Sequence, residues 1–187
     1  MVFIYFGNMK QALIIPFLLF CTWCNYLNAQ TVHELARTGT VEQMKAYLVK
    51  DSLALNRLSE RGISPFILAC YRGNNDVAKF LLDCGADVTY CTPEGSAMYG
   101  IIFKDNQTML NYLLDKGFSP NDTCQFAQFG TPLHMAMSLK RYEMVEALLA
   151  HKVDTSVPDP QGRSIKNLLT LYNDERLNTI FASYEKN

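Results

Sequence analysis

The sequence predicts an all-α protein, a solenoid of stacked helix-turn-helix units joined by hairpin-like loops. In three places a serine or threonine suited to start a helix is followed 18 residues later by a leucine, at 64–82, 96–114 and 131–149. The connections around these stretches vary between 14 and 17 residues. Apolar residues such as Val77 and Leu81 recur at helical spacing within them. Rigid units that alternate with adjustable surface loops are typical of a stacked repeat array.

Each unit is expected to contain two short antiparallel helices. A hydroxyl residue followed by proline opens two units, at 64–65 and 131–132, which supplies a helix cap and a residue suited to the first helical turn. Gly73 is expected to separate the two helices of its unit, and Gly85 and Gly117 are expected to end helices in the left-handed conformation. Because helices of about ten residues are marginal alone in water, stacking must stabilise them.

Two short motifs identify the type of repeat. Thr-Pro-Leu-His occurs at 131–134 and Gly-Ala-Asp-Val at 85–88. These motifs, with a period of roughly 33 residues, resemble the ankyrin repeat over residues 31–184. The resemblance implies five units, of which the first and fifth act as caps because terminal units must tolerate water on one face. The expected units span 32–48, 64–88, 96–117, 131–149 and 164–184.

Residues 1–30 differ from the rest of the chain. They contain one charged residue, Lys10, which precedes an uncharged stretch of 13 residues at 12–24. This pattern is typical of a secretory signal peptide and is short for a membrane span of about 20 residues. We therefore expect a signal peptide at 1–30, cleaved after Ala29 or Gln30, ahead of an ankyrin-repeat domain at 31–187.

Two alternatives to a cleaved signal peptide stay open. The additional apolar residues 2–6 are compatible with an uncleaved membrane anchor. Cys21 follows a stretch that resembles a lipoprotein processing site, although the bulky Phe20 stands where such sites need a small residue. Only an uncleaved anchor would make the membrane a partner of this chain.

The composition of residues 31–187 excludes several classes of protein. This part of the chain carries 16 Lys and Arg against 18 Asp and Glu, and the whole sequence has a pI near 6.3. Without a basic excess or an arginine-rich run, we expect no nucleic-acid partner. The abundance of large aliphatic residues argues against disorder. No second apolar run approaches the length of a membrane span, which excludes a polytopic membrane protein.

The sequence carries no recognisable catalytic or metal-binding motif. His33, His134 and His151 lie far apart and lack metal-ligand spacing. No nucleophile elbow, phosphate-binding glycine loop or zinc-protease motif is present. We therefore expect no catalytic residues, no bound metal and no cofactor. The ankyrin resemblance assigns His134 to stabilising its turn through hydrogen bonds. An enzyme or metal protein with an unrecognised site is kept as an alternative.

Four cysteines follow the predicted signal peptide. Cys70 is expected to face the neighbouring units as a buried thiol that acts as a small apolar residue. Cys91 and Cys124 occupy the loops that follow helix pairs in adjacent units, and we expect a disulfide between them. Free thiols are one alternative, and pairing of Cys91 with Cys84 is another.

The ankyrin resemblance also implies a binding surface. In ankyrin arrays the loops and the first helices form a concave face, onto which the two positions before each inter-helix turn project. Tyrosine and arginine, which are enriched in binding hot spots, occur at these positions. The predicted partner-binding residues are Arg37, Tyr71, Arg72, Phe103, Lys104, Leu139, Leu171 and Tyr172. The loop residues expected to extend this surface are Glu60, Arg61, Ile63, Phe126 and Gln128. In the alternative, some of these rings only cover the adjacent unit.

These observations predict a binding module rather than an enzyme. We expect an exported, periplasmic or secreted monomer that recognises another protein through its concave face. A membrane-anchored adaptor that retains residues 1–30 is the alternative. The fold does not identify the partner, because one fold carries many functions.

Overall fold

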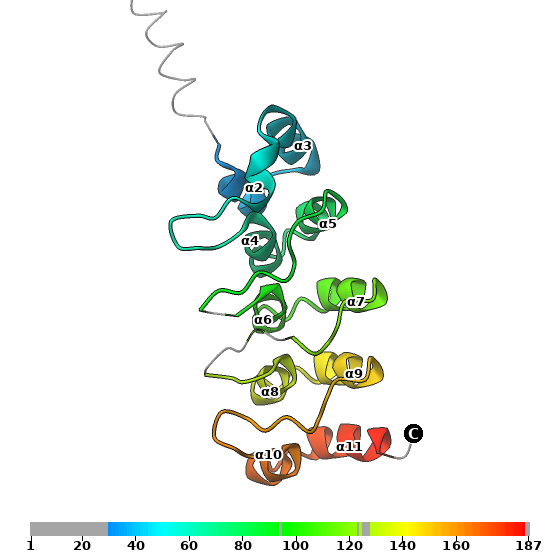
Figure 1. The fold of residues 1–187 in the computed structure, drawn as a ribbon. Coiled ribbons are helices and arrows are strands. Elements are labelled where there is room, and N and C mark those ends of the chain that lie inside the picture. Colours follow the sequence, from blue (N-terminus) through cyan, green and yellow to red (C-terminus); the bar gives the residue numbers. More distant parts are fainter. Residues whose placement is uncertain (1–29, 94, 123, 125–127, 186–187) are drawn as a thin grey trace, which may run out of the picture. The chain divides into compact units, whose positions relative to one another are not determined.

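The helices lie in two columns, an inner and an outer one (Figure 1). The computed structural model describes residues 30–93, 95–122, 124 and 128–185, and the predicted signal peptide lies outside them. The inner helices are α2 (Val32–Thr38), α4 (Pro65–Arg72), α6 (Ala97–Phe103), α8 (Pro132–Ser138) and α10 (Ile165–Tyr172). The outer helices are α3 (Val41–Lys50), α5 (Asn75–Asp83), α7 (Gln107–Asp115), α9 (Tyr142–Ala150) and α11 (Glu175–Tyr184).

The predicted fold class is confirmed. The described residues form ten α-helices and no strand, apart from an isolated bridge between Thr92 and Gly95. One short 3₁₀ helix, η1 (Ser52–Asn56), was not expected from the sequence, and it packs against α3. None of the helices in the described ranges is long and apolar enough to cross a membrane.

The helix boundaries follow the capping residues. The Ser64 hydroxyl accepts a hydrogen bond from the Ile67 backbone N–H at 3.2 Å, and proline follows it at the first helical position. At the other end of α4, Gly73 adopts a φ of 74°, in the left-handed region that glycine adopts without steric cost. The chain can therefore reverse at once into the outer helix α5.

The core runs along the faces where successive units meet. Helix α2 packs against α4, α4 packs against α6, and α6 packs against α8. The corresponding positions Ala36, Cys70, Ile102 and Met137 are all fully buried. Burial raises the pKa of the Cys70 thiol, which therefore stays protonated and acts as an apolar side chain. The core is continuous from unit to unit, so each short helix is stabilised by its neighbours.

Amide side chains link the inter-helix turns of successive units. Asn74 donates a hydrogen bond from Nδ2 to the backbone carbonyl oxygen of Gly39 at 3.0 Å. Asn75 and Asn106 exchange side-chain hydrogen bonds of 3.1 and 2.7 Å. Asn106 also caps α7 by accepting from the Met109 backbone N–H. These bonds fix the register between the first three units.

Asp174 joins the last two units. Its Oδ2 accepts hydrogen bonds from Lys140 Nζ and from the Tyr142 hydroxyl, both at 2.9 Å. Its Oδ1 caps α11 by accepting from the Leu177 backbone N–H. The hydrogen bond from Lys140 makes the largest contribution to lowering the pKa of Asp174, and the hydrogen bond from the Leu177 backbone makes the second largest. The resulting pKa is about 2. The lowered pKa means that the contribution of this carboxylate to stability is present at neutral pH. It is lost only as the pH falls through the range from 3.8 to about 2.

Candidate functional site

A groove of about 490 Å³ lies along the inner helices, on the side where the long loops project. Its helical lining consists of Arg37, Ile67, Leu68, Tyr71, Arg72, Tyr99, Gly100, Phe103 and Met135. Its loop lining consists of Arg61, Ile63, Thr92, Gly95, Ser96, Gln128 and Phe129. The volume lies within the range of roughly 300–1,000 Å³ that is usual for ligand-binding concavities. The groove is therefore large enough to accept side chains of a partner.

Two aromatic rings of this lining stack on each other. Tyr71 at the end of α4 and Phe103 at the end of α6 have ring centroids 6.0 Å apart, with planes 11° from parallel. Gly100, one turn before Phe103, faces Tyr71, and a Cβ atom there would lie 3.4 Å from Tyr71 Cβ. With this glycine in its middle, α6 runs without interruption from Ala97 to Phe103.

Cationic groups surround the Tyr71 ring. The Lys104 ammonium nitrogen lies 4.9 Å from the Tyr71 centroid and 5.7 Å from the Phe103 centroid. The Arg72 guanidinium lies 5.8 Å from the Tyr71 centroid. These distances are typical of cation–π contacts. Among the described residues that line the groove there are three arginines and no aspartate or glutamate.

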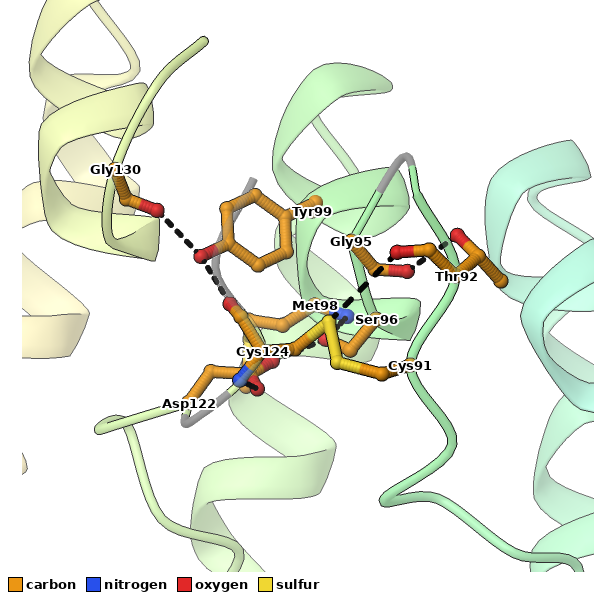
Figure 2. The surroundings of a disulfide bond; sticks show 9 residues. All are labelled: Cys91, Thr92, Gly95, Ser96, Met98, Tyr99, Asp122, Cys124 and Gly130. Atoms are coloured by element: carbon orange, nitrogen blue, oxygen red, sulfur yellow. Dashed lines mark hydrogen bonds between the residues drawn. A yellow bond between two sulfur atoms is a disulfide. The ribbon is translucent and has the colours of Figure 1, made fainter. Parts of the chain in front are cut away.

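A disulfide joins the two loops beside the groove (Figure 2). The structure pairs Cys91 with Cys124, with Cα atoms 5.6 Å apart, and leaves Cys84 as an exposed thiol. The loop before α8 is also held by Tyr99, whose hydroxyl lies 2.6 Å from each of the backbone carbonyl oxygens of Cys124 and Gly130 and shares its one proton between them. The wall of the groove is thus fixed covalently and by hydrogen bonds.

His134 has a structural environment. Its Nδ1 accepts a hydrogen bond from the Thr131 backbone N–H at 3.2 Å, while the Thr131 hydroxyl caps the start of α8. The side chain is buried, and burial lowers the pKa of His134, with the Asp159 carboxylate partly opposing this shift. The imidazole is therefore neutral at pH 7. No group of three or more His, Cys, Asp or Glu in the described ranges is arranged to hold a metal ion.

The structure brings together only part of the predicted face. Arg37, Tyr71, Arg72 and Phe103 line the groove, as do the loop residues Arg61, Ile63 and Gln128, and Lys104 lies over the aromatic pair. Leu139 and Tyr172 are half-buried and pack against the core. Leu171 is 57% exposed but lies outside the groove. Glu60 is exposed and does not line it, and Phe126 lies outside the described residues.

Sequence reasoning missed several of the residues that line the groove. Ile67 and Leu68 lie on the first turn of α4, and Phe129 lies in the loop before α8. Ile67 and Leu68 look like ordinary core residues in the sequence. Phe129 stands directly before the Gly-Thr-Pro that opens the fourth unit, and this is the one signal that places it beside the inner helices.

Comparisons with protein families decide the nature of the repeat. A family model for ankyrin repeats in three copies matches residues 32–124, and a model for a single ankyrin repeat matches residues 130–160. The chain belongs to the ankyrin-repeat family. Ankyrin repeats form a module for protein–protein interaction.

Curated relatives share parts of this ankyrin-repeat chain. A DNA-binding protein, RFXANK of Homo sapiens, is 38% identical over 61 residues, 33% of this chain and 24% of its own length. A tyrosine-protein kinase, HTK16 of Hydra vulgaris, is 24% identical over 171 residues, 88% of this chain and 20% of its own. An ankyrin repeat protein of Fowlpox virus, FPV230, is 27% identical over 75 residues, 40% of this chain and 39% of its own. The chain therefore spans well under half the length of each relative.

Proposed function

We propose that this ankyrin-repeat protein is an exported, periplasmic or secreted, monomeric binding module that recognises another protein through its concave groove. The observation that carries the proposal is the stacked pair of Tyr71 and Phe103 in a groove that arginines also line. Aromatic residues and arginine supply much of the binding energy at protein interfaces. The names of the relatives do not extend this proposal to DNA binding or kinase activity, because the chain covers only 24% and 20% of those proteins.

The disulfide supports export. Disulfides persist in oxidising compartments and are rare where thiols are kept reduced. Cys91 and Cys124 form such a bond, and residues 12–24 supply the apolar stretch of a signal peptide. The N-terminal sequence of the protein purified from its native source tests this part. We expect it to begin directly after Ala29 or Gln30. A protein that retains Lys10 and fractionates with membranes would instead support the anchored adaptor.

Affinity capture from the native source tests the binding function. The groove variant combines Arg72→Ala with Phe103→Ala, which removes one cation and one exposed aromatic ring. The control combines Lys45→Ala with Val49→Ala, which removes an exposed cation and an exposed apolar side chain from the outer helix α3. We expect the wild type and the control to retain the same partner and the groove variant to lose it. Retention by the folded groove variant would contradict the proposal.

A further inference from the structure

Six of the seven arginines of the array fall into two groups. Four pair with a carboxylate of this chain at 2.6–3.1 Å. The paired arginines are Arg57, Arg141, Arg163 and Arg176. Within the described part of the chain, neither Arg37 nor Arg72 has a carboxylate at ion-pair distance, and both are exposed and line the groove. The two of these arginines without an ion pair thus lie at one concave site, where Arg72 also contacts the Tyr71 ring.

An apolar surface lies beside these two arginines. Phe103 is 45% exposed, which is high for a large aromatic side chain, and its ring stacks on Tyr71. The side chain of Ile63 lines the same groove from the preceding loop. Burying apolar area of this kind against a partner contributes about 25 cal/mol per Å². The site therefore combines a positive potential with a surface that favours a flat apolar group.

Resting on the proposed function, we infer that the groove binds an extended acidic segment of a protein, in which carboxylates meet Arg37 and Arg72 and an aromatic side chain packs against the Tyr71–Phe103 pair. The guanidinium fork matches a carboxylate through two parallel hydrogen bonds. No Asp or Glu occurs among the described lining residues, so within them the charges of Arg37 and Arg72 are available to a partner. Charge complementarity of this kind selects acidic partners and accelerates their association.

A nucleic acid fits these observations less well. A single strand engages its protein through a basic groove that follows many phosphates and through several exposed rings. Here the stack consists of one exposed and one half-buried ring, and acidic residues outnumber basic ones by 18 to 17 in the chain. A single-stranded oligonucleotide is therefore a negative probe in the test.

Fluorescence anisotropy with defined peptides tests the inference on the purified protein with its disulfide intact. The first probe is a labelled peptide in which glutamate alternates with phenylalanine. The matched probes replace every glutamate with glutamine or with lysine, and a further probe is labelled oligothymidine. We expect the glutamate peptide to bind roughly tenfold or more tightly than the glutamine peptide, and the lysine peptide and the oligonucleotide to bind weakest. Equal binding of the three peptides, or tightest binding of the oligonucleotide, overturns the inference.

Two double variants with the same net charge locate the effect. Arg37→Gln with Arg72→Gln removes the two groove cations, and Lys45→Gln with Lys50→Gln removes two exposed cations from α3. All four side chains are exposed, so we expect both variants to fold, and thermal melting checks this. The groove variant should bind the glutamate peptide at least about tenfold more weakly, and the α3 variant should bind it as the wild type does. Equal loss in both variants would assign the effect to net charge and overturn the inference.

The capture experiment with the Arg72→Ala and Phe103→Ala variant distinguishes failure of the acidic specificity from failure of the groove as a binding site. If the peptides show no charge preference but capture of the native partner still depends on Arg72 and Phe103, the groove is a binding site and its acidic specificity is wrong. If capture is also independent of these residues, the groove itself is not the binding site.

Discussion

Tyr99 and His134 occupy the same position in adjacent units, three residues after the residue that caps the inner helix, and both are buried. Each side chain faces the loop that leads to the next unit. The Tyr99 hydroxyl donates to backbone carbonyls in the loop before α8, whereas the buried His134 Nε2 has no hydrogen-bond partner among the described residues and its imidazole lies near the Asp159 carboxylate of the loop before α10. The same position of the repeat thus holds its loop by hydrogen bonds in the third unit, whereas in the fourth unit it places a buried imidazole beside the loop.

The Tyr99→Phe variant should unfold at lower denaturant concentration. The substitution keeps the ring but removes the hydroxyl group that donates to the carbonyls of Cys124 and Gly130. Loss of a buried hydrogen bond costs about 1–2 kcal/mol of unfolding free energy. Urea unfolding followed by circular dichroism measures the difference. Tyr184→Phe, at the exposed end of α11, is the control and should unfold like the wild type.

The stability of the protein should fall as the pH drops below the ordinary histidine pKa of 6.5. Burial lowers the pKa of His134 in the folded state, so the unfolded chain binds the proton more readily. The stability that depends on neutral His134 is therefore present above pH 6.5 and lost as the pH falls toward the lowered pKa. Urea unfolding between pH 7.5 and about pH 5 measures this loss.

The His134→Asn variant isolates this contribution. Asn167 occupies the same position in the fifth unit and completes the same capping box with Ser164. The substitution should therefore keep the cap of α8 while it removes the titrating group. We expect a smaller loss of unfolding free energy between pH 7.5 and about pH 5 than in the wild type. An unchanged pH dependence would show that another group is responsible.

Glycine in place of Lys152 should stabilise the protein. Lys152 adopts a φ of 60°, at the position where Gly85 and Gly117 end the outer helices of earlier units with φ of 86° and 85°. A side chain in this left-handed region costs roughly 1 kcal/mol, which is partly offset by the greater freedom of glycine in the unfolded chain. We therefore expect Lys152→Gly to raise the unfolding free energy by about 0.5–1 kcal/mol.

The reverse substitution, Gly117→Lys, provides the matched test. No atom lies within 4 Å of a Cβ built at Gly117, so the backbone conformation alone sets its cost. It should lower the unfolding free energy by about as much as Lys152→Gly raises it. Effects of the same sign from the two substitutions would contradict this explanation.

The bond between Cys91 and Cys124 should contribute strongly to stability. It closes a loop with a sequence separation of 33, for which the chain-entropy relation gives about 3.7 kcal/mol. The double variant Cys91→Ser with Cys124→Ser should show this loss in urea unfolding, and a reducing agent should then have little further effect. Cys84→Ser, which changes an exposed thiol, should unfold like the wild type. Equal sensitivity of the wild type to urea with and without reductant would argue against the bond.

The sequence was sufficient to predict the units because their periodicity, capping residues and turn glycines are local signals. The 3₁₀ helix at Ser52–Asn56 carries no such signal, since its only buried residue is Ala54. The shape and complete lining of the groove could not be predicted from the sequence. The groove is formed by contacts between units, such as Gly100 facing Tyr71 and Tyr99 reaching the loop at Gly130, which local sequence signals do not define. Leu139 and Tyr172 occupy the repeat positions that the sequence predicts to face a partner, yet they pack on the core. A repeat position alone does not determine whether a neighbouring unit covers the side chain.

Site-specific photo-cross-linking in the native source tests most directly whether the groove is the site of protein binding. A photoreactive phenylalanine derivative at position 103 probes the groove, and the same group at position 49, where Val49 is 80% exposed on α3, probes the outer column. We expect a partner protein to be cross-linked from position 103 and not from position 49. Cross-linking of the same partner from position 49 alone would contradict the assignment of the groove.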